Sequence, residues 1–217
     1  MLKQMQTIGA RIGIVAVAIL MGSTLATNVR AQAVVANSSF ESPGQGPDGF
    51  SLSVPPGWTQ VNGGSSGLGV FHPTIAAWGY AAPDGNQVLY LNSATVEQQL
   101  ATTVAAGQSY LLAVQVVRRP GFWNPNYRID FLAGDFLLGT DLGTLVPPNG
   151  GSLVSLISYT AGSADPAVGQ ALKIRLSGPT QTNYDNVRVF VPEPELGFAL
   201  AAIAPLVAVG LGRRRRR

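Results

Sequence analysis

Apolar and polar residues alternate in short runs along the middle of the chain, and turn-forming residues separate these runs. Leu172, Ile174 and Leu176, for example, alternate with basic side chains. A period of two is typical of a strand with one buried face. Between residues 34 and 191 no stretch keeps the period of a helix. The pattern therefore predicts an all-β domain.

The same reasoning predicts about nine strands without helical crossovers, so the strands should pair antiparallel in a two-sheet jelly-roll sandwich. One strand, at residues 110–117, is apolar on both faces, which predicts a central strand buried on both sides. Residues 42–80 are rich in glycine and predict loops with one or two short strands. The predicted strands are Val34–Asn37, Val88–Leu91, Val96–Thr102, Tyr110–Val117, Tyr127–Phe131, Phe136–Leu138, Leu153–Tyr159, Leu172–Leu176 and Val187–Val191.

The N-terminal end reads as a targeting segment rather than as part of the fold. Two basic residues flank the start of an apolar run of about ten residues, which is too short to span a bilayer. Ala31 and Ala33 then form the small-x-small pattern at which a signal peptidase cleaves. We expect residues 1–33 to be a signal peptide, followed by one β-sandwich domain at residues 34–190.

Residues 191–217 hold three parts in order: a Pro-Glu-Pro motif, an apolar run and an arginine cluster. The run predicts a short transmembrane helix whose arginines stay on the cytoplasmic side. This end resembles the PEP-CTERM sorting signal of Gram-negative bacteria. The resemblance implies recognition by an exosortase-type membrane protease, removal of the tail and delivery to the cell surface. The residues concerned are Pro192, Glu193, Pro194, Arg213, Arg214, Arg215, Arg216 and Arg217.

The two ends also carry most of the positive charge. Of the 14 lysines and arginines, six lie between residues 34 and 190, where they face nine acidic residues. The domain is therefore mildly acidic, and the basic pI of the whole chain does not indicate nucleic-acid binding. The chain has no cysteine and one histidine, which excludes a disulfide scaffold and a zinc centre built from these residues.

Several motifs in the domain are similar to bacterial jelly-roll domains of the galactose-binding, carbohydrate-binding-module type. They include Asn37–Glu41, Pro83–Asn86 and Tyr184–Val187. The resemblance implies that the first and last strands are neighbours, with a structural Ca²⁺ between Glu41 and Asp185. Calcium needs six to eight oxygen ligands, so the two acids could instead cap turns or accept bonds from backbone amides. No other cofactor is expected.

Aromatic residues gather in two loop regions rich in proline and glycine. Trp78 and Tyr80 belong to the first region, and Phe122 and Trp123 belong to the second. Exposed aromatic faces stack on sugars, which makes these four residues candidates for ligand binding. The alternative is that they are buried and close the end of the sandwich.

The sequence offers no convincing catalytic residue. Residues 63–67 spell a hydrolase elbow, but no strand precedes them and no helix follows. Residues 44–49 spell a dinucleotide-binding fingerprint, but Pro47 prevents the helix that this motif requires. The sequence therefore predicts that the protein is not an enzyme.

The resulting hypothesis is an exported, non-catalytic binding or structural module at the surface or in the extracellular matrix of a Gram-negative bacterium. The alternative is a lectin-like module that binds exopolysaccharide, and a hydrolase ranks behind both. Expected partners are signal peptidase, the exosortase-type protease, the membrane before processing and extracellular polysaccharide. Nucleic acid is not expected.

Overall fold

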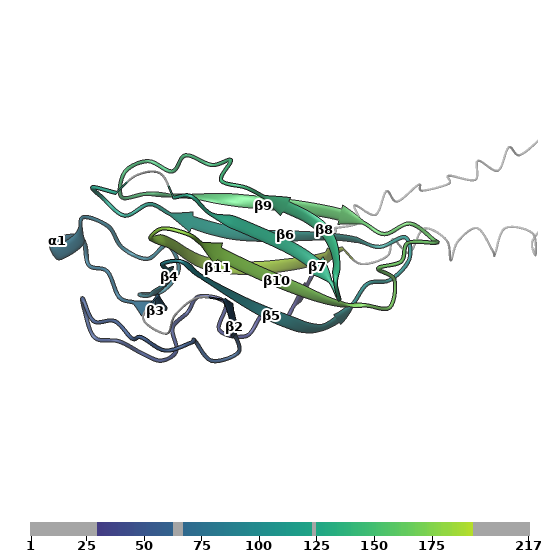
Figure 1. Cartoon of the computed structure of the whole chain (residues 1–217), viewed down its shortest axis with the longest axis horizontal. Coiled ribbons are helices and arrows are strands. Elements are labelled where there is room, and N and C mark those ends of the chain that lie inside the picture. The colour runs from purple at the N-terminus through teal and green to yellow at the C-terminus, as the bar shows by residue number, and fades with distance from the viewer. Residues whose placement is uncertain (1–29, 63–66, 123–124, 193–217) are drawn as a thin grey trace, which may run out of the picture.

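Two antiparallel sheets packed face to face form the protein, whose computed structural model describes residues 30–62, 67–122 and 125–192 (Figure 1). The first sheet has the order β3-β4-β11-β6-β9, with β1 also paired to β11, and the second has the order β2-β5-β10-β7-β8. This arrangement confirms the predicted all-β, two-sheet sandwich. The elements are β1 (Arg30–Ala33), β2 (Thr59–Asn62), β3 (Leu68–Phe71), α1 (Ile75–Trp78), β4 (Val88–Leu91), β5 (Ala94–Thr103), β6 (Ser109–Val117), β7 (Arg128–Ala133), β8 (Phe136–Asp141), β9 (Ser152–Thr160), β10 (Ala171–Gly178) and β11 (Thr182–Pro192).

The core lies between the inner faces of the two sheets, and the alternation along each strand explains it. On β10 the apolar side chains at positions 172, 174 and 176 are fully buried. The intervening Arg175 points outward and lies opposite Glu97 on β5, at 2.9 Å between Nη2 and Oε2. Opposite charges across a strand pair suit a solvent-facing surface, so the hydrophobic pattern and the register agree.

Two strand predictions are wrong in detail. Residues 34–37 do not form a strand, because Asn37 and Phe40 adopt positive φ and turn the chain after β1. The strand at residues 109–117 is fully buried on its inner side only, and its outer side chains are mostly half-exposed. The reason is that the outer face of the first sheet is covered at one end only.

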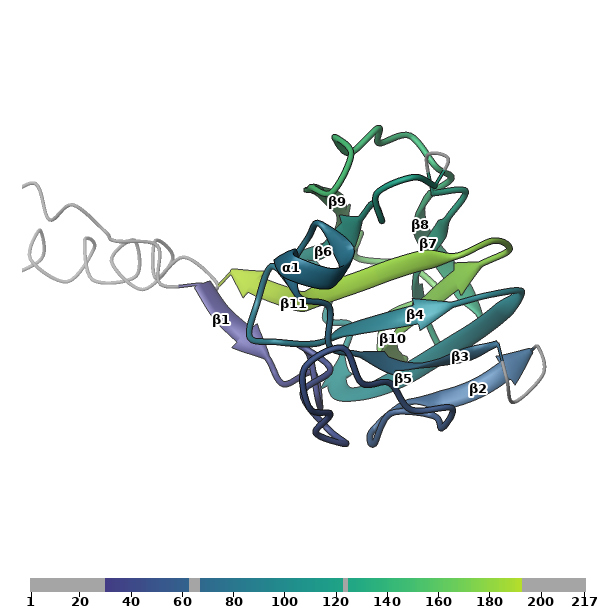
Figure 2. The same cartoon turned by 90° about the vertical axis from the view of Figure 1, so that its left-hand side faces the viewer.

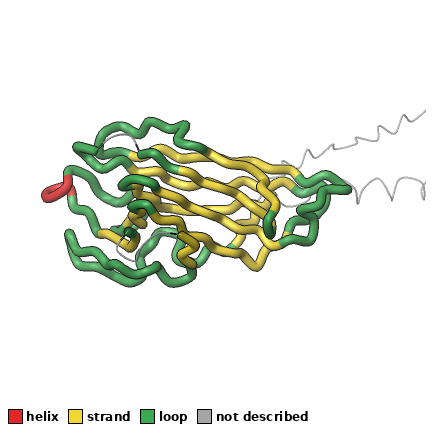
Figure 3. The backbone as a smooth tube through the Cα atoms, in the orientation of Figure 1, coloured by secondary structure: helices red, strands yellow, loops and turns green. Residues whose placement is uncertain are grey.

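That cover comes from the long segment between β1 and β4, which holds β2, β3 and α1. Figure 1 shows α1 at one tip of the sandwich, and Figure 3 shows loops gathered at the same tip. A second, smaller apolar cluster lies there on the outer face of the first sheet, separate from the main core. Its buried members are Phe71, Tyr80, Val88, Tyr90 and Val117, with Trp78 and Ala82 packed against them.

No helix in the part of the chain that the structure describes is long and apolar enough to cross a membrane. The predicted signal helix, the predicted C-terminal helix and the arginine tail lie outside the described residues. Their boundaries therefore stay predictions.

Candidate functional site: an aromatic pocket on the first sheet

A pocket of about 310 Å³ opens over the smaller apolar cluster. Aromatic and aliphatic side chains form most of its wall, and four polar side chains lie among them. We call it the aromatic pocket. Its lining residues are Asp48, Phe50, Leu52, Phe71, Trp78, Tyr90, Asn92, Arg119 and Gln181.

The register of the first sheet places the floor of this pocket. Tyr90 on β4 lies opposite Gly69 on β3 and opposite Asn183 on β11, and Asn183 lies opposite Val117 on β6. These residues share the outer face, because they form one row across the strands. The row brings together positions that are far apart in the sequence, as Figure 2 shows for β3, β4 and β11.

Gly69 allows a loop to form one wall of the pocket. A Cβ at position 69 would lie 1.9 Å from the backbone oxygen of Ser51, so only glycine lets the loop approach β3 so closely. Ser51 also accepts a hydrogen bond from the Tyr90 hydroxyl at 2.7 Å. The neighbouring Phe50 and Leu52 are 60% and 54% exposed and present apolar surface at the pocket.

Arg119 provides the positive charge of the site. Its guanidinium lies 4.3 Å from the ring centroid of Trp78 and 4.6 Å from that of Phe122. Both contacts are cation–π interactions, in which the positive charge lies over an aromatic ring. Nη1 donates a hydrogen bond to Oε1 of Gln181 at 3.2 Å. Among the described residues no carboxylate forms an ion pair with Arg119.

A buried polar pair lies next to this arginine. The Nδ2 atom of Asn183 donates to the Tyr80 hydroxyl at 3.0 Å, and the two side chains are 1% and 2% exposed. Burial raises the pKa of Tyr80 to about 12, although the charge of Arg119 and the bond from Asn183 act in the opposite direction. Oδ1 of Asn183 and Nε1 of Trp78 are buried without a hydrogen-bond partner. Such atoms are rare in folded proteins and mark places where a ligand can complete the bonding.

The two predicted calcium ligands meet at the turn formed by residues 83–86. Glu41 accepts hydrogen bonds from the backbone amides of Asn86 and Gln87, both at 2.8 Å. Gly85 at φ 72° makes room for this, because a Cβ there would lie 2.5 Å from Oε1 of Glu41. Asp185 accepts from the amide of Asp84 at 2.8 Å. The acids therefore do bond to backbone amides, as the alternative interpretation expected.

Asp185 is nevertheless in an unusual electrostatic position. It is fully buried and accepts hydrogen bonds from the backbone amides of Asp84 and Asn186, and no basic side chain of the described residues forms an ion pair with it. Burial raises its pKa to about 8, and the negative charges of Asp84 and Glu41 add to this against the two amide bonds. Within the described ranges no three His, Cys, Asp or Glu side chains converge on a metal position.

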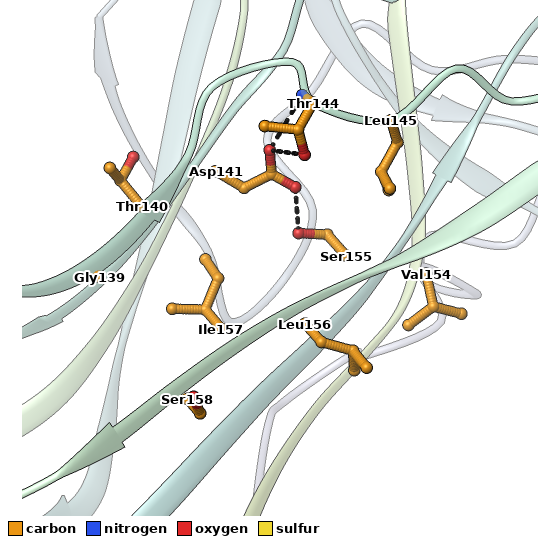
Figure 4. A pocket seen from close by; sticks show the side chains of 10 residues that line it. All are labelled: Gly139, Thr140, Asp141, Thr144, Leu145, Val154, Ser155, Leu156, Ile157 and Ser158. Atoms are coloured by element: carbon orange, nitrogen blue, oxygen red, sulfur yellow. Dashed lines mark hydrogen bonds between the residues drawn. The ribbon is translucent and has the colours of Figure 1, made fainter.

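A second, larger hollow of about 540 Å³ lies between β8 and β9 and contains Asp141 (Figure 4). The Asp141 carboxylate accepts bonds from the Tyr127 hydroxyl at 2.8 Å, from the Ser155 hydroxyl at 2.5 Å, and from the hydroxyl and amide of Thr144 at 2.8 and 3.1 Å. Burial acts to raise the pKa of Asp141, but these bonds outweigh it and hold the pKa below its ordinary value. A carboxylate that is ionised and already accepts four hydrogen bonds stabilises the packing of the strands and is not suited to transfer protons.

The structure thus brings three of the four predicted aromatic residues to one site. Trp78 lines the aromatic pocket, Tyr80 lies in the cluster beneath it, and Phe122 stacks on Arg119. Trp123 lies outside the described residues. Sequence reasoning missed Arg119 and Asn183. The signal that could have indicated them is a polar residue next to buried strand positions. Arg119 follows β6 by two residues, and Asn183 lies in β11.

The predicted cleavage and sorting residues lie at the margin of the described chain. Ala31 and Ala33 belong to β1, which pairs with β11 through Val191 and Val189. Cleavage after Ala33 would remove this strand. Pro192 ends β11, and the remainder of the Pro-Glu-Pro motif lies outside the described residues.

Comparison with known proteins gives a clear family. The family model described as HpiC1 cyclase matches residues 31–190. An apo cyclase from Fischerella sp. matches with a TM-score of 0.69 and 26% identity, over 76% of this chain and 98% of the other. The Stig cyclase Fisc from Fischerella sp. TAU, in complex with (3Z)-3-(1-methyl-2-pyrrolidinylidene)-3H-indole, matches with a TM-score of 0.68 and 25% identity, over 76% and 100%. Comparison with curated protein sequences gives no match.

These findings contradict the prediction that the protein is a non-catalytic binding or structural module. The prediction that it is not an enzyme is therefore wrong. The lectin-like and hydrolase alternatives are likewise unsupported. The error has a physical origin: the motifs that indicated a jelly-roll describe a scaffold, and one scaffold carries unrelated functions. With the family model covering most of the sandwich, the chain belongs to the HpiC1-like cyclase family.

Proposed function

We propose that this protein is a cyclase and that its substrate binds in the aromatic pocket. The observation that carries the proposal is a largely apolar pocket with a few convergent polar groups, on a chain of the HpiC1-like cyclase family. Pockets of roughly 300–1,000 Å³ with such walls are typical small-molecule sites. A cyclase from Fischerella sp. TAU has been solved in complex with 4-(1H-indol-3-yl)butan-2-one. We infer an aromatic substrate of comparable character here.

The pocket suits ring closure for three physical reasons. Apolar walls hold a flexible substrate in a folded conformation, so the reacting atoms are brought together before reaction. The rings of Phe71, Trp78 and Tyr90 exclude water and can stabilise positive charge that develops on a reacting hydrocarbon. Among the lining residues, the side chains of Asn92, Arg119 and Gln181 supply donors and acceptors for polar groups of the substrate.

Tyr80 lies buried in the cluster beneath the pocket and supports the site from below. Asp48 is the one carboxylate among the lining residues, and its Oδ1 is held by the Thr74 amide and hydroxyl at 3.1 and 2.7 Å. The Tyr80 oxygen accepts from Asn183, which leaves the hydroxyl hydrogen for another acceptor. Burial raises the pKa of Tyr80 to about 12, and the charge of Arg119 offsets this only in part, so the hydroxyl keeps its proton at neutral pH. We assign Tyr80 and Asn183 this supporting role.

Binding of 4-(1H-indol-3-yl)butan-2-one tests the site. We expect saturable binding by calorimetry, with affinity about tenfold or more weaker in W78A, because the indole side chain forms the pocket wall and holds Arg119. The control is F136A, an exposed aromatic residue on β8 of the other sheet. Equal loss in both variants, or no binding by the unaltered protein, would contradict the proposal.

A structural Ca²⁺ between Glu41 and Asp185 forms a second part of the proposal. The donor set fits a hard cation, since both ligands are carboxylates and the opening motif adjoins the closing strand through the bond from the Val187 amide to the Ser38 carbonyl at 2.9 Å. A cation would compensate the buried charge of Asp185. Backbone carbonyls would have to supply further oxygens. Its contribution would be structural, joining the two ends of the fold on the sheet that carries the aromatic pocket.

We also propose that the chain is exported and that its C-terminal tail is removed, on the basis of the signal-peptide pattern and the PEP-CTERM resemblance. Mass spectrometry of the intact protein recovered from the cell surface tests both steps. A mass that begins near Val34 and ends near Pro194 is expected. A mass that retains Arg213–Arg217 would contradict tail removal, and one that retains Arg30–Ala33 would place cleavage before β1.

A further inference from the structure

We infer that the aromatic pocket recognises a substrate with an anionic group, and that Arg119 binds this group. The inference rests on the proposed function, because it places the substrate in the same pocket. It adds the charge of the substrate and names the residue that selects for it. Arg119 differs from four other arginines of the described chain in its surroundings and partners.

The contacts of Arg119 leave its hydrogen-bonding edge open. The guanidinium carbon lies over the rings of Trp78 and Phe122, so two aromatic contacts help to position the group. Arginine has five N–H donors arranged around that plane. One nitrogen, Nη1, donates to Gln181, and among the described residues the Arg119 side chain makes no other hydrogen bond. The donors that remain belong to a side chain that lines the aromatic pocket.

Four other arginines of the described chain have other partners. Arg128, Arg175 and Arg188 pair with carboxylates at 2.8–3.5 Å. Arg118 donates to backbone oxygens of Phe122 and Pro147. Arg118 also has no carboxylate partner in the described residues, but it lines a separate pocket with Phe122 and Asn149. Of these arginines, Arg119 is the one that lines the aromatic pocket, and no carboxylate of the described residues pairs with it. A positive charge held by aromatic rings, without a carboxylate, is the arrangement that a bound anion completes.

The surrounding groups support an anion on one side of the pocket. Asp48 also lines the pocket, but its carboxylate is bound by Thr74 and forms no ion pair with Arg119. The amide side chains of Gln181, which contacts Arg119, and of Asn92 also line the pocket and can donate hydrogen bonds to an oxyanion. The rings of Phe71 and Tyr90 would take the apolar part of the same molecule. The expected substrate is therefore an aromatic compound with a carboxylate or phosphate.

A matched set of ligands tests this inference with the whole protein. The neutral probe is 4-(1H-indol-3-yl)butan-2-one, and the anionic probes are 4-(1H-indol-3-yl)butanoate and 3-(1H-indol-3-yl)propyl phosphate. We expect the unaltered protein to bind one or both anions about tenfold or more tightly than the ketone, which corresponds to one strong charge-assisted contact. The anion that binds more tightly distinguishes a carboxylate substrate from a phosphate.

Variants show whether Arg119 causes the preference. In R119Q the preference should disappear while the ketone still binds, and R119K should keep part of it because it keeps the charge without the fork geometry. R175Q, which removes an arginine from the outer side of the second sheet, is the control and should behave like the unaltered protein. If the ketone binds and the anions bind no better, or if R119Q keeps the preference, the inference is overturned. If no probe binds the unaltered protein, that result contradicts the proposed function as well as this inference.

Discussion

Removing the Asp141 carboxylate should destabilise the protein without affecting the aromatic pocket. In D141A the hydroxyls of Tyr127 and Ser155, both about 2% exposed, lose a charged acceptor. Each buried donor left without a partner costs about 1–3 kcal/mol. Two such donors, with the bonds from Thr144 in addition, predict a loss of about 3–5 kcal/mol. D141N keeps one acceptor oxygen and should lose about half as much.

Chemical and thermal denaturation measure this loss directly. For a domain of this size a loss of 3–5 kcal/mol lowers Tm by about 10 °C or more. The pH dependence has a definite sign: because the folded pKa of Asp141 lies below its ordinary value of 3.8, its stabilisation is present above that value and disappears as the pH falls through the folded pKa. The unaltered protein should therefore lose stability at acid pH, and D141N should lack this loss.

The same variants show which of the two pockets binds the ligand. At a temperature where it is folded, D141A should bind 4-(1H-indol-3-yl)butan-2-one as the unaltered protein does, because Asp141 lies in the hollow between β8 and β9 and not in the aromatic pocket. D135A removes an exposed acid next to the β7–β8 turn and should change stability by less than about 0.5 kcal/mol. Unchanged stability together with lost binding in D141A would refute this reasoning and make Asp141 a functional residue.

Two further predictions concern the other buried polar groups. If Ca²⁺ binds beside Asp185, EDTA should lower Tm by several degrees and added Ca²⁺ should restore it, whereas D185N should show neither response; equal responses in both proteins would remove the proposed site. Y80F keeps the ring but removes the acceptor of Asn183, so unfolding measurements should show a loss of about 1–2 kcal/mol. Stability equal to that of the unaltered protein would mean that the Asn183 amide finds another partner.

The sequence predicted the sandwich because each strand buries one face. Apolar and polar residues therefore alternate along the strand, and this alternation is visible in the sequence. The strands at residues 88–91 and 172–176 lie where the pattern places them. The positive φ values of Asn37 and Phe40 leave no trace in a hydrophobic pattern, so the missing strand at residues 34–37 could not be recognised. The meeting of Glu41 and Asp185 at one turn was expected from family resemblance, not from spacing.

The pocket itself was not predictable, because it depends on register across three strands. Tyr90, Asn183 and Val117 lie in one row only once β4, β11 and β6 have paired, and no local signal relates these positions. The aromatic residues in the loops were noticed, but their partner Arg119 was assigned no role.

The two faces of the first sheet explain how one sandwich can hold an enzyme site without catalytic motifs. The inner face is occupied by the core, so its residues are constrained by packing. At the tip of the outer face, where the loops fold back, Phe71 of β3 and Tyr90 of β4 meet a wall supplied by Phe50, Leu52 and Trp78. A site of this kind combines rows of strand residues with loop residues, so its chemistry changes with single substitutions that leave the fold intact. Function in such a chain must therefore be argued from the outer face, where Arg119 and Asn183 lie, and not from the strand pattern that defines the sandwich.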